Sequence, residues 1–112
     1  MKKFCLALDL KDDENLILQY EEYHRAVWPD IEASLDAAGI HAMEIFRTGT
    51  RLFMIMETVD EFSFEEKDKA DRSNKKVVEW EALMSMYQQS LPHARPGEKW
   101  VLMKNIFKWK KK

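Results

Sequence analysis

The sequence predicts an α+β fold in a single domain that spans residues 1–112. Three observations support this prediction. Residues 3–10 and 51–58 are almost continuously apolar over the length of a strand. Residues 74–89 repeat apolar side chains at helical spacing. The chain has only three glycines and three prolines, so long regular segments follow one another with few breaks. A chain of this length has room for one hydrophobic core and not for two.

The segment after the first strand is expected to form a helix over residues 14–27, ENLILQYEEYHRAV. Asp12 and Asp13 are N-cap candidates, because a short acidic side chain accepts hydrogen bonds from the first free backbone N–H groups. Trp28 precedes Pro29, and a residue before proline is pushed out of the α region. The helix is therefore expected to break at Trp28.

A second helical piece is expected over residues 29–38, because proline suits the first position of a helix and Gly39 suits the position after its end. Residues 41–47 alternate loosely and the apolar segment 51–58 follows, so both are predicted strands. Residues 48–50 between them, Thr-Gly-Thr, are predicted to close a β-hairpin.

The second half of the chain predicts helices over residues 61–71 and 74–89, then a loop marked by Pro92 and Pro96, and a closing strand over 99–109. The order is strand, helix, strand, strand, helix, helix, strand. This is the order of the ferredoxin-like split βαβ arrangement, a four-stranded antiparallel sheet with helices on one face.

The second strand of the hairpin predicts a partner subunit. Leu52, Met54 and Met56 alternate onto one of its faces, and Phe53 and Ile55 onto the other, so both faces are apolar. Helices cover one face, and a chain this small has little left for the other. We therefore expect a homodimer through the sheet face, a dimeric α+β barrel.

Composition and charge indicate an intracellular, soluble domain. The 18 Lys and Arg residues against 20 Asp and Glu residues give a net charge of −2, which does not suit a nucleic-acid-binding surface. The single cysteine, Cys5, excludes an internal disulfide. The first apolar run is too short for a signal peptide, and no segment approaches the roughly 20 apolar residues that cross a bilayer. We expect a cytoplasmic protein without nucleic-acid or membrane partners, and a solvated lysine-rich C-terminus.

No motif for a metal or cofactor is present. The three histidines, His24, His41 and His93, are not paired at metal-binding spacing, and no CxxC or HExxH pattern occurs. No GxGxxG or GxxxxGK loop is present to hold a nucleotide. We therefore expect neither a metal nor a cofactor.

Tyr20 and His24 are the candidate chemical groups. They are four residues apart, so on a helix they lie one above the other, on the side away from Glu21, Glu22 and Arg25. One interpretation is that they fill the interface between helix and sheet. The other is that they line a cavity, where His24 transfers protons near neutral pH and Tyr20 positions a ligand or donates a proton. The pattern alone leaves both open.

The four tryptophans, Trp28, Trp80, Trp100 and Trp109, are a high number for this length. Indole rings fill cores and interfaces, and they also stack on the apolar faces of sugars. The composition does not separate these roles.

The chain nevertheless resembles the L-rhamnose mutarotase family over essentially its whole length. The resemblance is carried by the pattern Tyr20-x-x-x-His24-x-x-x-Trp28-Pro29, the run Ile31-Glu32-Ala33-Ser34-Leu35 before Gly39, the strand 52–57, Trp80, and Phe107 near the end.

The resemblance implies a cytoplasmic homodimer that interconverts the α and β anomers of L-rhamnose without a cofactor. It makes His24 the proton donor and Tyr20 a substrate contact, and it matches Trp80 to one member of a tryptophan pair beside the sugar. Trp28, at the bend beside the pocket, is expected to join these substrate contacts.

Three departures from the family pattern bear on the choice of sugar. Glu79 stands where the second tryptophan of the pair is expected, and Met43 stands where a sugar-contacting tyrosine is expected. The loop LPHARPGEKW, residues 91–100, is longer than the family pattern. L-Rhamnose is the expected substrate, and L-fucose is the closest alternative. Glu79 is disfavoured as a second acid–base group, because adjacent helix positions point about 100° apart.

Two other interpretations fit the same small fold. One is a monooxygenase that acts on haem or an aromatic substrate. The other is a non-enzymatic module that binds a small ligand without turnover.

Overall fold

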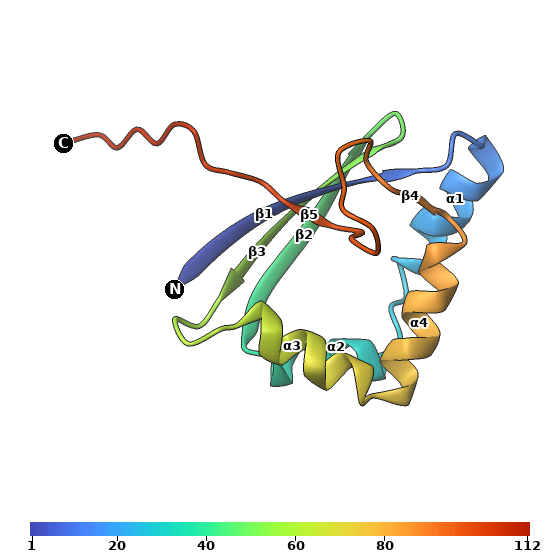
Figure 1. The fold of residues 1–112 in the computed structure, drawn as a ribbon, viewed down its shortest axis with the longest axis horizontal. Coiled ribbons are helices and arrows are strands. Elements are labelled where there is room, and N and C mark those ends of the chain that lie inside the picture. The colour runs from blue at the N-terminus through green and yellow to red at the C-terminus, as the bar shows by residue number, and fades with distance from the viewer.

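A computed structural model describes all 112 residues of the chain (Figure 1). Its strands are β1 (Lys2–Leu10), β2 (Ile40–Thr48), β3 (Arg51–Thr58), β4 (Gln88–Gln89) and β5 (Val101–Leu102), and its helices are α1 (Glu14–Tyr23), α2 (Pro29–Ala37), α3 (Phe64–Arg72) and α4 (Lys75–Ser85). The sheet order is β2-β3-β1-β4, with β5 also paired to β1, and every pairing is antiparallel. All four helices lie on one side of the sheet (Figure 1), which confirms the predicted ferredoxin-like architecture.

Two short strands share the fourth position of the sheet. β4 pairs with the end of β1 at Leu10, and β5 pairs with its middle at Leu6 and Ala7. Of the predicted closing strand over residues 99–109, only Val101 and Leu102 form a strand, and the rest of that prediction was wrong. Strands need neighbours to pack against, and the tail has none: Ile106 is 90% exposed and Phe107 is 78% exposed. Figure 1 shows the tail leaving the body of the molecule.

Helix α1 begins as predicted and ends earlier than predicted. Its N-cap is Asp13, whose carboxylate accepts from the backbone N–H groups of Asn15 and Leu16 at 3.0 and 3.1 Å. The helix was expected to reach residue 27, but His24 is already its C-cap. From His24 to Ala26 each backbone N–H donates to the carbonyl three residues earlier instead of four, so the α-helix ends in a tighter turn. The chain uses the segment before Trp28 to turn toward α2, so His24 lies at a helix end.

Helix α2 has the predicted terminal residues. Pro29 occupies its first position, and Gly39 follows its C-cap with a φ of +86°. A β-carbon built on Gly39 would lie 2.7 Å from Cγ2 of Val59, which is too close for any side chain. Glycine is therefore required here for two reasons, the positive φ and the close approach.

Replacing Gly39 with alanine is expected to lower the free energy of unfolding by about 1–3 kcal/mol, because alanine is strained at positive φ and its methyl group meets Val59. Gly49→Ala is the matched control, since Gly49 has a φ of +56° with no heavy atom within 4 Å of the added carbon. Denaturant unfolding of both variants measures the difference. Equal losses in the two variants would show that the contact with Val59 costs nothing.

Helix α4 was predicted to run to residue 89, and it ends at Ser85 instead. The carbonyl oxygen of Tyr87 accepts a hydrogen bond from the backbone N–H of Lys11 at 2.9 Å, and Gln88 pairs with Leu10. These long-range bonds to the end of β1 take the place of further helical turns. Because paired residues point to the same face of a sheet, Gln88 shares the helix-covered face with the buried Leu10.

The hydrophobic core lies between the helices and one face of the sheet. Leu52, Met54 and Met56 of β3 are buried there, as their alternation predicts. On the opposite face Phe53 and Ile55 are only half-buried and Phe46 of β2 is 51% exposed. The chain thus leaves one apolar sheet face uncovered. None of its helices combines the length and apolar character that a bilayer span requires.

Candidate active site

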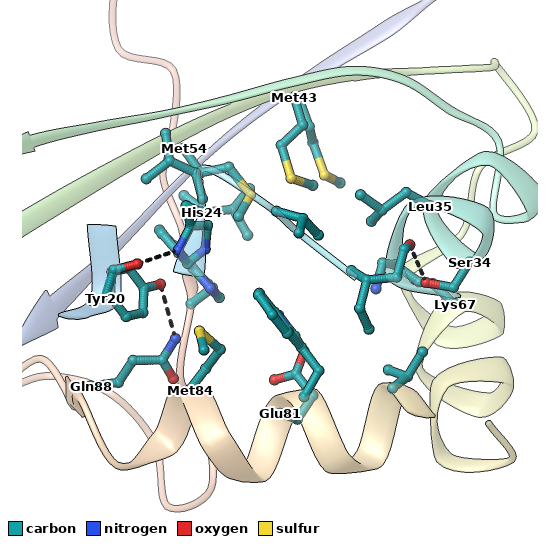
Figure 2. Close-up of a pocket in the computed structure, with 18 of the residues that line it drawn as sticks. Tyr20, His24, Ser34, Leu35, Met43, Met54, Lys67, Glu81, Met84 and Gln88 are labelled. Carbon is teal, nitrogen blue, oxygen red and sulfur yellow. Dashed lines mark hydrogen bonds between the residues drawn. The ribbon is translucent and has the colours of Figure 1, made fainter. Parts of the chain in front are cut away.

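A cavity of about 300 Å³ opens between the sheet and the four helices. This volume is at the lower end of the range typical of small-molecule sites. Its walls are mainly apolar side chains, including Met43, Met54 and Met56. Apart from the indole rings of Trp80 and Trp100, six lining residues carry polar groups: Tyr20, His24, Ser34, Lys67, Glu81 and Gln88. Figure 2 shows Tyr20, His24 and Gln88 grouped on one side of the cavity and Ser34 and Lys67 on the other.

His24 is oriented by the helix that it ends. Its Nδ1 lies 2.8 Å from the carbonyl oxygen of Tyr20, one turn earlier (Figure 2). A carbonyl oxygen only accepts hydrogen bonds, so in the neutral ring Nδ1 carries the proton. The second ring nitrogen, Nε2, then carries no proton and can take one up, and it can release a proton only from the imidazolium form. The side chain is half-buried and lines the cavity, so the ring is within reach of a ligand.

Tyr20 lies beside His24 and is almost completely buried. Its ring centroid is 4.5 Å from that of His24, and its hydroxyl oxygen accepts a hydrogen bond from Nε2 of Gln88 at 3.3 Å. Burial raises the pKa of the Tyr20 phenol; the hydrogen bond from Gln88 lowers it, and the carboxylate of Glu81 raises it further. The phenol therefore keeps its proton at neutral pH and can donate it to a ligand.

The ionisation of Tyr20 is expected at a higher pH than that of an ordinary tyrosine. The folded chain holds the phenol proton at pH values where the unfolded chain loses it. The associated stability is complete below the ordinary pKa of about 10 and is lost as the pH rises through the raised folded value. The ultraviolet difference titration between the wild type and Tyr20→Phe isolates this group. A difference signal that appears at the ordinary pKa of tyrosine would contradict the effect of burial.

Trp80 and Trp28 are in contact, but only Trp80 lines the cavity. The Trp80 ring packs edge to face against His24 at 5.7 Å and against Trp28 at 5.1 Å. Trp28 thus packs behind Trp80. It was predicted to contact a ligand, but it is not among the residues that line the cavity. Lys76 lies over the Trp28 ring at 5.9 Å. Tyr20, His24 and Trp80 are brought together as the sequence predicts.

The departures from the family pattern fall at different distances from the cavity. Met43 on β2 lines it directly, and so does Trp100 at the end of the long loop. Glu79 does not line it, and its carboxylate lies 3.5 Å from the ammonium group of Lys76 on the surface of α4. Of the three departures, Met43 and the long loop that carries Trp100 therefore reach the cavity, and Glu79 does not.

Sequence reasoning missed Glu81, Lys67 and Gln88. A signal for Glu81 was present, because it is four residues after Val77 and three before Met84, a charged residue on the apolar stripe of α4. Gln88 continues that spacing, but it is placed by pairing with β1 and not by a helix. Lys67 comes from α3, which has no buried residue to mark its inner face.

The arrangement is suited to proton transfer. The cavity brings together an imidazole, a neutral phenol and one carboxylate, that of Glu81. Cys5, the one thiol of the chain, is not among the lining residues. No three histidine, cysteine, aspartate or glutamate side chains gather as the ligands of a metal do. Acid–base chemistry on a small, partly apolar ligand is the reaction that these groups support.

Comparison with known proteins gives matches along the whole chain. The sequence model of L-rhamnose mutarotase matches residues 3–109. The L-fucose mutarotase of Xanthomonas campestris pv. campestris is 45% identical over 109 residues, which cover 96% of this chain and 87% of that protein.

Solved structures show the same fold at low identity. The L-rhamnose mutarotase from Formosa agariphila has a TM-score of 0.72 at 17% identity, with 98% of this chain and 100% of that chain covered. The tetracenomycin F2 cyclase of Streptomyces glaucescens, a type II polyketide cyclase, has a TM-score of 0.61 at 16% identity, with both chains fully covered. One fold thus carries different reactions, so the fold by itself does not identify the chemistry.

Proposed function

Since the chain belongs to the L-rhamnose mutarotase family and is a sugar mutarotase, we propose that it interconverts the α and β anomers of a 6-deoxy-L-hexose with His24 as the proton donor. The observation that carries the assignment of His24 is its geometry. One ring nitrogen is held by the Tyr20 carbonyl, and the other is left to a cavity of about 300 Å³. The family match therefore favours the mutarotase over the two other interpretations of the sequence, a monooxygenase and a non-enzymatic module.

Mutarotation requires one acid and one base. The acid protonates the ring oxygen, the base removes the proton of the anomeric hydroxyl, and the bond between the anomeric carbon and the ring oxygen breaks to give an aldehyde. Rotation about the adjacent C–C bond and reclosure on the other face give the second anomer, and both protons return. His24 acts as the acid through the Nε2–H of its doubly protonated imidazolium form, and Tyr20 holds the sugar through its hydroxyl. Glu81, the one carboxylate in the lining, is the base.

The cavity walls support a 6-deoxy sugar. Its C6 is a methyl group, which suits the methionine-rich part of the lining around Met43, Met54 and Met56. L-Fucose and L-rhamnose share this methyl group and differ in configuration at C2 and C4. We favour L-fucose, because the relative at 45% identity is named for it and because Met43 departs from the rhamnose pattern. L-Rhamnose is the second candidate, named by the family description.

Saturation-transfer NMR between the α and β anomeric protons tests the function directly. The protein is expected to accelerate exchange in L-fucose and L-rhamnose, with the higher kcat/KM for L-fucose. L-Galactose is the matched control for the methyl group, since it differs from L-fucose only in the hydroxyl at C6, and it is expected to react more slowly. If the exchange rates of both deoxy sugars equal those in buffer, the proposal is wrong.

We also propose that two copies of the chain associate through the uncovered sheet face. The support is the apolar character of this face, where Phe46 pairs with Phe53 in the β2–β3 register and Ile55 lies two residues further along β3. All the helices lie on the other side (Figure 1). A cytoplasmic location stays a prediction from the sequence.

Phe53→Glu is expected to convert the dimer to a monomer, because it buries an unpaired charge in the proposed interface. Light scattering coupled to gel filtration measures the mass, which is expected to fall to that of one 13.4 kDa chain. Val78→Glu is the control, since Val78 is 49% exposed on the helical side. A wild-type protein that is itself monomeric at micromolar concentration would contradict the proposal.

A further inference from the structure

Gln88 is the cavity residue with an unmet hydrogen-bonding capacity. Its Nε2 donates to the hydroxyl oxygen of Tyr20 at 3.3 Å (Figure 2). Its Oε1 is buried and accepts no hydrogen bond, and it is the one buried side-chain oxygen or nitrogen of the chain without a partner. The residue lines the cavity next to Tyr20.

An unpaired buried amide oxygen is costly, because it has given up water without gaining a donor. Such groups are rare in folded proteins and call for an explanation. Here the surroundings are the wall of a cavity, and the polar neighbour on the same wall is already bonded to the other end of the amide. A donor that enters the cavity, met by a small movement of the Gln88 side chain, is the partner that the geometry lacks.

We infer that Gln88 is a substrate-binding residue, whose Oε1 accepts a hydrogen bond from a ring hydroxyl of the sugar while its Nε2 holds the oxygen of Tyr20. This inference rests on the proposed function. Because Gln88 donates to the Tyr20 oxygen, the phenol proton of Tyr20 is left free to point at the sugar. One amide side chain thus fixes the sugar directly and also directs the hydroxyl that faces it.

The role of Gln88 also provides a source of specificity. The hydroxyls at C2 and C4 point in different directions in L-fucose and L-rhamnose. An acceptor at a fixed place on the wall bonds the hydroxyl that points to it and is left unpaired by the epimer. Sites built to bind a hydroxyl discriminate well against ligands that lack it in that place.

The test is sugar binding by calorimetry together with exchange NMR on Gln88→Met, which removes both polar atoms at nearly constant shape. Affinity for the preferred sugar is expected to fall about 5- to 30-fold, the loss of one good hydrogen bond. Gln89→Met is the control, since Gln89 is the exposed neighbour on β4 and is expected to bind like the wild type. Circular dichroism and thermal unfolding report on folding. Gln88→Glu keeps an acceptor, and it serves as the second variant if Gln88→Met is unfolded.

A series of 2-, 3- and 4-deoxy sugars identifies the hydroxyl and separates direct contact from a structural effect. One deoxy sugar is expected to bind the wild type as weakly as the parent sugar binds Gln88→Met, and to lose nothing further in the variant. If every deoxy sugar shows the same relative loss in both proteins, Gln88 makes no direct contact.

The two proposals fail in different ways. Without anomer exchange in the wild type, the proposed function is wrong, and the binding series still decides whether Gln88 contacts a sugar. If the wild type is active and Gln88→Met matches it in affinity and kcat for every sugar, only the role of Gln88 is wrong.

Discussion

Replacing His24 with alanine is expected to slow anomer exchange by about 10²–10⁴-fold, the usual contribution of one positioned acid–base group. The variant keeps Tyr20, Trp80 and the cavity, so it still binds sugar. The loss is therefore expected in kcat, with a small change in KM. Exchange NMR with L-fucose and L-rhamnose at saturating concentrations measures it.

The matched controls are His41→Ala and His93→Ala, because both imidazoles are exposed and neither lines the cavity. Both variants are expected to exchange anomers at the wild-type rate. Added imidazole is expected to restore part of the activity of His24→Ala and to leave the controls unchanged. Wild-type rates in His24→Ala with both sugars would remove His24 from the mechanism.

Trp80→Ala is expected to have the largest effect on stability. Trp80 is 6% exposed, and its ring meets those of Tyr23, His24 and Trp28 edge to face. Truncation of a buried tryptophan to alanine costs about 3–5 kcal/mol in the free energy of unfolding. Chemical denaturation measures this loss, and sugar affinity is expected to fall with it, because Trp80 is also a cavity wall.

Glu79→Ala is the control for Trp80→Ala, since it changes the neighbouring residue on the exposed side of α4. Its effect is expected within about 0.5 kcal/mol, as for most surface substitutions. Trp80→Phe is expected to recover part of the stability by refilling the space with an aromatic ring. A loss below 1 kcal/mol in Trp80→Ala would mean that the ring packs less tightly than its contacts indicate.

The half of the site on α1 could be predicted because its geometry is local. Helical spacing places Tyr20 above His24 whatever the rest of the chain does, and the cap at Asp13 is set by a side chain and its nearest N–H groups. The role of the pair could not be derived in the same way, since a filled interface and a cavity wall have the same spacing. The family resemblance separated the two interpretations.

The half of the site that faces α1 could not be predicted in this way. Periodicity extended α4 to residue 89, but the backbone of β1 offers hydrogen bonds that end the helix at Ser85 and place Gln88 in a strand. Glu81 and Lys67 reach the cavity from two helices whose relative position depends on how they pack on the sheet. No local pattern contains that information.

By itself the sequence determined the ferredoxin-like order of elements, the turn residues at Gly39 and Gly49, and the pairing of Tyr20 with His24. These features follow from hydrogen bonds and steric contacts between residues close together in the chain. Only the tertiary structure decided that Trp28 supports Trp80 instead of facing the cavity, that the fourth strand is divided, and that Gln88 places an unpaired oxygen beside Tyr20. The contact of the two tryptophans depends on how the start of α2 packs against α4. The other two features depend on the pairing of β1 with segments about 80 or more residues away, whose hydrogen bonds exist only once the sheet has formed.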